Sequence, residues 1–232
     1  MSKVSVIIAV WNGENYLEKA IENVLKQDDP NKELIVVNDG STDLTAQIIQ
    51  KWSPYIISIE QKNQGLGSAR NRGIQAATGE FLAFLDHDDL WHEKKLSTQR
   101  KTWEKSLDDP LIFSHMKQFF CPTLKEDERK KISMHSDETP GYFAGTLWIS
   151  KQRFTQVGNF TEQNILGDFI EWYLRAKEQH IPIHLMEETL YYRRIHQNNM
   201  GRKNQNRRSD YLKIFKEHLT RKREILTALQ DV

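Results

Sequence analysis

The sequence contains a single cysteine, Cys121, among its 232 residues, which excludes an internal disulfide and favours a reducing compartment. No apolar run approaches the roughly 18 residues that a membrane span needs, and the N-terminus enters an apolar stretch without the pattern of a secretion signal. The formal net charge of +1 gives no overall case for nucleic acid as a partner. We therefore expect a cytoplasmic protein, and a position at the inner face of the membrane stays open.

What the sequence does contain is a regular alternation of strand and helix patterns in its first half. Short apolar runs predict strands at residues 4–10, 33–37, 55–59 and 80–85, and helical spacing predicts helices near 16–25, 42–51 and 68–77. Asn12 or Asn15 is the predicted cap of the first helix, and Ser41 or Thr42 of the second. This order predicts an α/β fold with a doubly wound, mostly parallel sheet.

The second half of the chain is less regular. Its pattern predicts helices at 94–107 and 169–176, strands at 111–120, 141–149 and 189–195, and a mobile polar loop at 121–140. A long helix over 207–229 has apolar residues on one face and an excess of Lys and Arg. Three roles stay open for it: packing on its own domain, peripheral contact with an anionic membrane, or pairing in a homodimer.

A run of acidic residues follows the strand predicted at residues 80–85. Asp86, His87, Asp88 and Asp89 come directly after this buried strand, where open α/β sheets bind ligands. Carboxylates packed this closely repel each other unless something offsets their charge, and Mg²⁺ or Mn²⁺ shared with a phosphate would do so. The alternative is a solvated turn that caps a helix starting near Trp91.

Other groups suited to a nucleotide follow the neighbouring strands. Trp11 could stack on a base, Asp39 could accept its imide proton, and the loop 63–67 carries glycine that lets backbone approach a ligand. Arg70 and Arg72 could pair with phosphate. Each has an ordinary alternative, as a core tryptophan, a turn aspartate or surface arginines. Their joint position at one edge of a parallel sheet favours a nucleotide-diphosphate site.

Four of these segments carry a resemblance to a known family. In order along the chain they are VIIAVWN at 6–12, VVNDGSTD at 36–43, NQG at 63–65 with ARNRG at 69–73, and GEF at 79–81 leading into LDHDD at 85–89. They resemble the successive motifs of the family 2 glycosyltransferases of the GT-A fold. The resemblance covers roughly residues 3–96 and continues more weakly through segments at 158–160, 168–175 and 192–200.

The resemblance implies an architecture, a reaction and a set of site residues. It implies a GT-A domain over 1–200, with a Rossmann-like nucleotide-sugar-binding half at 1–96 and an acceptor half at 97–200, followed by a C-terminal helix at 201–232. It also implies transfer with inversion from a nucleotide-sugar donor, with Mn²⁺ or Mg²⁺ as cofactor. The implied donor-site residues are Ala9, Trp11, Asn12, Glu14, Asp39, Asn63, Gly65, Arg70, Asp86 and His87, and the implied metal ligands are Asp86, Asp88 and His196.

The sequence departs from the family pattern at the catalytic base. The family commonly has adjacent Glu and Asp before an arginine like Arg175, but here the pair reads Asp168-Phe169. Asp168 and Glu171 lie one helical turn apart on one face, so both are candidates. We favour Asp168 as the base; its alternative is a helix N-cap, and Glu171 could instead pair with Arg175.

Three classes of function are therefore compared. The favoured one is an inverting, metal-dependent glycosyltransferase that uses a UDP-sugar and an unidentified glycan, lipid, peptide or small-molecule acceptor. The others are a non-catalytic sugar-nucleotide-binding module and a sugar nucleotidyltransferase, which would want a glycine-rich basic loop after the first strand. Hydride transfer is disfavoured because that loop lacks G-x-G-x-x-G.

Overall fold

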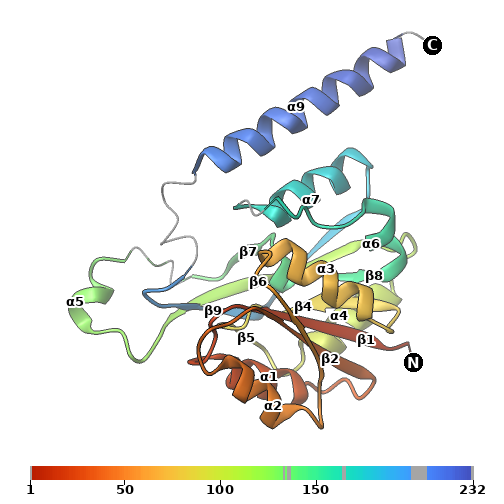
Figure 1. Ribbon diagram of the computed structural model, residues 1–232. Helices are drawn as coiled ribbons and strands as arrows, with labels where there is room; N and C mark the ends of the chain where they lie inside the picture. The colour runs from red at the N-terminus through yellow and green to blue at the C-terminus, as the bar shows by residue number, and fades with distance from the viewer. Residues whose placement is uncertain (1, 133, 135–136, 164–165, 200–207, 231–232) are drawn as a thin grey trace.

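The computed structural model describes residues 2–132, 134, 137–163, 166–199 and 208–230. Its first half alternates strand and helix as predicted (Figure 1). The elements are β1 (Val4–Val10), α1 (Leu17–Leu25), β2 (Lys32–Asp39), α2 (Thr45–Trp52), β3 (Ile57–Gln61), α3 (Leu66–Ala76) and β4 (Phe81–Phe84). The strands β3, β2, β1 and β4 pair in this spatial order, and all their pairings are parallel.

The second half extends the same sheet with mixed strand directions. Its elements are β5 (Leu90–Trp91), α4 (Lys95–Glu104), β6 (Leu111–Phe120), α5 (Glu126–Arg129), β7 (Thr139–Gly141), the 3₁₀ turn η1 (Ala144–Thr146), β8 (Trp148–Ser150), α6 (Lys151–Val157), α7 (Asp168–Glu178), β9 (Ile183–Ile195) and α9 (Arg208–Gln230). The sheet runs β3-β2-β1-β4-β8-β6-β9-β5, with β7 beside β6. The pairing of β6 with β9 is parallel, whereas β8 is antiparallel to both β4 and β6.

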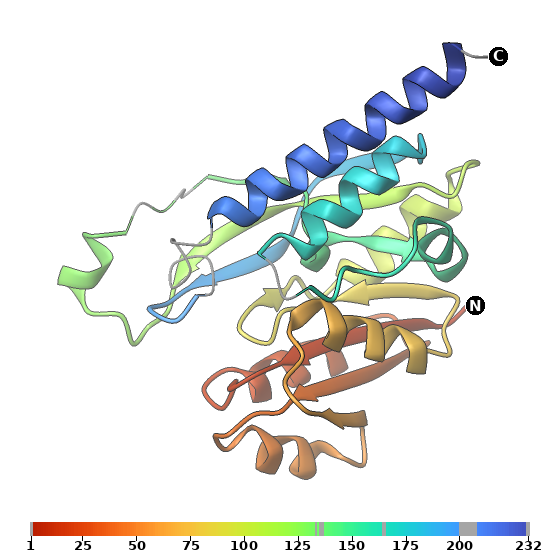
Figure 2. The same cartoon turned by 45° about the horizontal axis from the view of Figure 1, so that its top comes forward.

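Two apolar cores cover the two faces of this sheet, because successive strand residues point to opposite sides. Val6 and Ile8 of β1 pack with the buried faces of α1, α2 and α4. Ile7 and Ala9 pack instead with α3, α6 and α7. Figure 2 shows this layered arrangement, with the sheet between α1 and α2 on one side and α3 and α7 on the other. The alternation explains why β1 has no exposed residue.

Several local predictions were wrong at element boundaries. Neither α1 nor α2 has a side-chain N-cap, so Asn12, Asn15, Ser41 and Thr42 do not cap these helices. Trp91 lies in the short strand β5, which pairs with β9, and α4 begins only at Lys95. The apolar run 141–149 is mostly η1 and β8 and not one strand. The segment 121–140 contains the helix α5.

The C-terminal helix α9 packs against α7. Tyr211 and Ile214 lie over Gly167, so closely that a Cβ atom on this glycine would sit 2.9 Å from the tyrosine ring. Further along, His218 and Arg221 bind the carboxylate of Glu178. Of the three roles predicted for this helix, the structure therefore shows packing on its own domain. The expected domain boundary at 200/201 lies outside the described residues. No helix within those residues is long and apolar enough to cross a membrane.

Candidate active site

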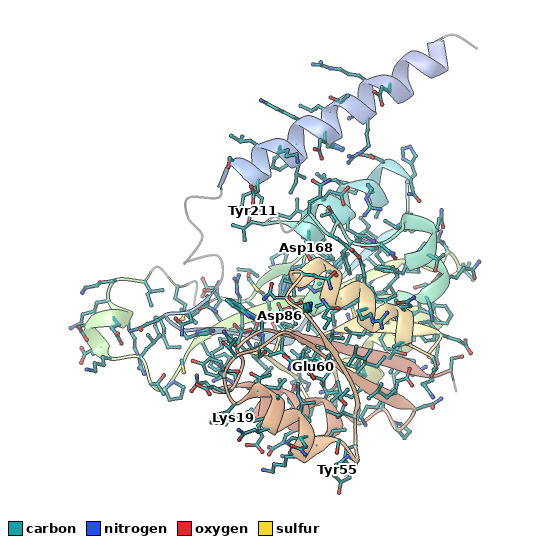
Figure 3. The ribbon with its side chains drawn as sticks, viewed as in Figure 1. Lys19, Tyr55, Glu60, Asp86, Asp168 and Tyr211 are labelled. Atoms are coloured by element: carbon teal, nitrogen blue, oxygen red, sulfur yellow. The ribbon has the colours of Figure 1, made fainter. Side chains whose placement is uncertain are left out.

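The parallel strands bring the predicted polar residues to one edge of the sheet. Val10 at the end of β1 pairs with Asn38 of β2, and Ile7 pairs with Phe84 at the end of β4. Trp11 directly follows β1, Asp39 is the last residue of β2, and Asp86 lies two residues after β4, so all three emerge at the carboxyl edge where such sheets bind ligands. Figure 3 shows Asp86 and Asp168 in the middle of the view, well above Tyr55 at its bottom.

Asp39 organises the loop between β3 and α3. Its buried carboxylate accepts hydrogen bonds from the backbone N–H groups of Gln64 (2.8 Å) and Gly65 (2.9 Å) and from the Gln61 side chain (2.8 Å). Gly65 has a φ of 91°, which only glycine adopts without strain. Asn63 belongs to the same loop, and its backbone N would lie 2.7 Å from a Cβ on Gly40. A carboxylate offers about four acceptor positions, so Asp39 keeps capacity for one further donor.

The loops after β1 and β2 are joined by the side chains of Asn12 and Glu14, which the sequence had suggested as residues that bind the nucleotide-sugar donor. The Asn12 side chain accepts from the backbone N–H of Thr42 (2.8 Å), and Glu14 accepts from that of Leu44 (3.1 Å). These two residues therefore hold the loops together. Ala9 is buried in the core, whereas Trp11 is 54% exposed and so is not the core tryptophan of the ordinary alternative. Its ring is available for stacking.

The acidic residues after β4 differ in their shortest hydrogen bonds, although the Tyr191 hydroxyl lies near both Asp86 (3.4 Å) and Asp89 (2.6 Å). Asp86 accepts from Arg70 at 2.9 Å, and Asp88 lies 2.9 Å from Nε2 of His196. Burial alone would raise the pKa of Asp88, but the hydrogen bond from His196 and the charges of His87 and His196 outweigh it and lower the pKa. These bonds across the fold show that the segment is an ordered loop and not a solvated turn.

The last carboxylate, Asp89, fixes the loop to β9. It is buried and accepts from the hydroxyl of Tyr191 and from the backbone N–H of Arg194, both at 2.6 Å. Burial first, and then the charges of Asp88 and Asp86, raise its pKa well above the ordinary value. The sequence pattern did not separate Asp89 from its neighbours, because its partners lie more than a hundred residues away.

Arg70 joins the acidic loop to the candidate base. Its guanidinium is buried and donates to Asp86 at 2.9 Å and to Asp168 at 2.8 Å. Burial alone would lower the pKa of Arg70, but the two carboxylates outweigh it and raise the pKa further. Arg70 therefore bridges Asp86 and Asp168 inside the protein. Arg72 instead lines a separate surface hollow of about 640 Å³, and no acidic-loop residue lines this hollow.

The two candidate bases have different surroundings. Asp168 is the first residue of α7, and the N-cap is Gly167, so the alternative of an N-cap aspartate was wrong. Glu171 forms a two-point ion pair with Arg175, at 2.8 and 3.1 Å, as its alternative role predicted. Arg175 also donates to backbone carbonyls of Val157 and Asn159. Glu171 is thus part of a structural network, whereas Asp168 contacts the site through Arg70.

His196 is held as a hydrogen-bond donor. Its Nδ1 lies 3.2 Å from the backbone N–H of Asn198, which places the proton of a neutral ring on Nε2, toward Asp88. Its ring also lies 4.7 Å from that of Tyr16. In this arrangement His196 orients the Asp88 carboxylate. Binding a metal through Nε2 would require the other tautomer.

A divalent cation at the site would need ligands from the side chains there. Within the described residues, no three or more His, Cys, Asp or Glu side chains gather into a group that could hold a metal alone. A closed protein cage is not required, because Mg²⁺ usually takes one or two carboxylates and fills its shell with phosphate and water. Asp86 and Asp88 supply two carboxylates within one loop. This set fits a cation that is shared with a bound diphosphate.

Solved structures of similar shape identify the fold. The Staphylococcus aureus TarS structure of residues 1–349 matches with a TM-score of 0.68 and 22% identity, covering 83% of this chain and 60% of that one. The mannosyltransferase PcManGT from Pyrobaculum calidifontis, solved with GDP-Man and Mn²⁺, matches with a TM-score of 0.69 and 17% identity over 94% of this chain and 64% of that one. The predicted GT-A fold is confirmed.

Sequence comparison gives the same grouping. Uncharacterized glycosyltransferase RT0329 of Rickettsia typhi is 33% identical over 208 residues, which are 83% of this chain and 64% of the relative. Putative glycosyltransferase EpsH of Bacillus subtilis is 31% identical over 182 residues, 77% of this chain and 52% of the relative. The chain spans between 16% and 64% of the length of three rickettsial relatives that it matches. Residues 5–171 match the family described as "Glycosyl transferase family 2", and the chain therefore belongs to this family, as its motifs predicted.

Proposed function

We propose that the protein transfers a sugar, with inversion, from a nucleotide-diphosphate donor to an acceptor hydroxyl. The observation that carries this proposal is the bridge Asp86–Arg70–Asp168, which sets a candidate base beside the acidic loop at the carboxyl edge of the sheet. An inverting displacement needs a base on the side of the sugar opposite the leaving diphosphate. Asp86 lies in the loop after β4 and Asp168 is the first residue of α7, so the two carboxylates reach the site from different elements.

The proposed reaction needs one proton transfer. The acceptor oxygen attacks the anomeric carbon, the bond from this carbon to the diphosphate oxygen breaks, and the hydroxyl proton passes to Asp168. Arg70 binds Oδ2 of Asp168, which leaves Oδ1 for the acceptor. Asp86 and Asp88 would hold Mn²⁺ or Mg²⁺, and such a cation, when bound, neutralises charge on the leaving diphosphate. His196 keeps Asp88 oriented for this.

The nucleotide is proposed to be uridine diphosphate. Asp39 retains an acceptor position that suits the N3–H of uracil, and Trp11 offers an exposed ring beside the same edge. TarS has been solved with UDP and with UDP-GlcNAc, whereas PcManGT was solved with GDP-Man. These complexes support a nucleotide-sugar donor for this chain, and the carboxylate of Asp39 favours uridine as its nucleoside.

A screen of nucleotide sugars tests the proposal. The chain is incubated with UDP-, GDP- and CDP-sugars and Mn²⁺, and release of the nucleoside diphosphate is measured with and without excess chelator. We expect slow, metal-dependent hydrolysis of a UDP-sugar, because water can replace the missing acceptor. Tight binding without any release would support the non-catalytic alternative. Release of pyrophosphate from UTP and a sugar phosphate would support the nucleotidyltransferase.

Asp39→Ala is expected to weaken binding of UDP by about 1.5–3 kcal/mol, which is the range for a hydrogen bond to a charged group. Calorimetry should show little effect on CDP, since cytosine has no N–H at position 3. Gln61→Ala is the matched control: it removes one partner of Asp39 but keeps the carboxylate, so UDP affinity should change by less than about 0.5 kcal/mol. Equal losses for UDP and CDP would mean that Asp39 only supports the loop.

A further inference from the structure

The helix α9 has one face that its own domain buries and another that it leaves exposed. Ile214 is 1% exposed, and His218 and Arg221 bind Glu178 of α7. Leu212, Phe215 and Leu219 are 65%, 48% and 52% exposed. Figures 1 and 2 both show α9 on the outer side of α7, with its C-terminal end reaching beyond the rest of the fold.

The three exposed apolar residues form one stripe. They are spaced by three and four positions, and a helix turns about 100° per residue, so they fall within about 60° of each other around the axis. This stripe lies beside the packed face and not within it. A large exposed aromatic and two leucines in one line are more than the scattered apolar residues of an ordinary surface.

Charge is distributed unevenly around this stripe. At about 100° per residue, Lys216 lies about 65° to one side of its centre and Lys222 about 55° to the other. Glu217 and Glu224 lie about 150–170° away, on nearly the opposite side of the helix. The apolar stripe of α9 therefore has basic borders, and the exposed side chains of these two glutamates lie away from it.

The apolar stripe and its basic borders distinguish between two possible partners, a second copy of the chain and a lipid surface. If two copies paired through the stripe, the lysines on both borders would face lysines, and the glutamates could not reach across to neutralise them. An anionic lipid surface satisfies both features, because acyl chains accept the stripe while headgroups attract its basic borders. We propose that α9 docks the protein on an anionic lipid surface through Leu212, Phe215 and Leu219, bordered by Lys216 and Lys222. This goes beyond the proposed function, since it concerns where the protein is held and not what it transfers.

Vesicle flotation with the full chain tests the proposal. Binding is compared on vesicles of phosphatidylcholine alone and of phosphatidylcholine with phosphatidylglycerol, at low and high salt. We expect strong preference for the anionic vesicles and loss of binding in high salt. Lys216→Glu with Lys222→Glu should lower partitioning by at least about 30-fold. Phe215→Ser with Leu219→Ser should lower it by at least about tenfold.

The matched control reverses the charge of two exposed lysines that lie outside α9. Lys26→Glu with Lys101→Glu makes the same change in net charge on the helical layer across the sheet, and it should change partitioning by less than about threefold. Thermal unfolding shows whether each variant is folded. Equal binding to both kinds of vesicle, or equal losses in the control and α9 variants, would overturn the proposal. A dimer in sedimentation that Phe215→Ser with Leu219→Ser dissociates would assign the stripe to a second copy.

Discussion

Asp88→Asn is expected to lower the rate of sugar transfer by at least about a thousandfold, because a Lewis-acidic cation contributes several kcal/mol to stabilising a leaving diphosphate. Asparagine matches aspartate in shape and can still accept the hydrogen bond from His196, so the protein should remain folded. It lacks the negative charge that a divalent cation needs. Calorimetric titration of Mn²⁺ in the presence of UDP should show a parallel loss of affinity.

Asp89→Asn is the control for this experiment, since it makes the same change one residue further along. Asp89 faces Tyr191 and the backbone of Arg194, and its pKa is already raised, so burial favours the neutral form that asparagine imitates. We expect Mn²⁺ affinity to fall by less than about tenfold and the thermal midpoint to decrease slightly. If Asp89→Asn abolished Mn²⁺ binding while Asp88→Asn kept it, or if turnover continued in excess chelator, the assignment of Asp88 would be wrong.

The central parallel sheet was predictable because its strands are nearly continuous apolar runs. Residues 4–10 form a strand with the predicted boundaries, since every residue of the run except Ser5 is apolar. Residues 111–120 also form a strand with the predicted boundaries, although polar residues interrupt its second half. The acidic residues after β4 were correctly placed at the carboxyl edge for the same reason. A strand that is buried on both faces cannot hold charge along its length, and these acidic residues follow it in sequence, so they emerge at its carboxyl end.

Helix starts were harder to predict, because side chains that suit a cap can find distant partners. Asn12 was a good candidate to cap α1, yet its side chain binds the backbone of Thr42, thirty residues away. The run 141–149 was apolar enough for a strand, but Gly145 packs directly against the ring of Tyr191 and its carbonyl accepts from the indole of Trp91. The local sequence pattern carries no information about these distant contacts, so tertiary packing determined the backbone conformation of these segments.

The contacts within the site were the least predictable part. The sequence suggested phosphate for Arg70, whereas the structure surrounds it with Asp86 and Asp168, the second of which lies 98 positions away. The sequence likewise offered two candidate bases on one helical face, and it favoured Asp168 because this residue lies nearest the family motif. The ion pair with Arg175 now distinguishes Glu171, because a carboxylate held at two points by its own helix is a structural group.

Asp168→Asn is therefore expected to lower turnover by at least about a hundredfold, since a positioned base typically contributes roughly 10²–10⁴-fold. Asparagine can keep the bond to Arg70 through its carbonyl oxygen, and Arg70 keeps Asp86, so the bridge should survive. The variant then lacks only the group that accepts the proton. Steady-state kinetics should show the loss in kcat, and calorimetry should show donor affinity within about threefold of the parent protein.

Glu171→Gln is the matched comparison on the same face of α7. It removes one partner of the ion pair with Arg175, so we expect a stability loss of about 0.5–1 kcal/mol and turnover within about threefold of the parent. A dead Glu171→Gln beside an active Asp168→Asn would reverse the two roles. If both variants kept full turnover, the base would lie outside α7, and substitution of the carboxylates within residues 126–138 would be the next experiment, because that acidic segment comes from the proposed acceptor half.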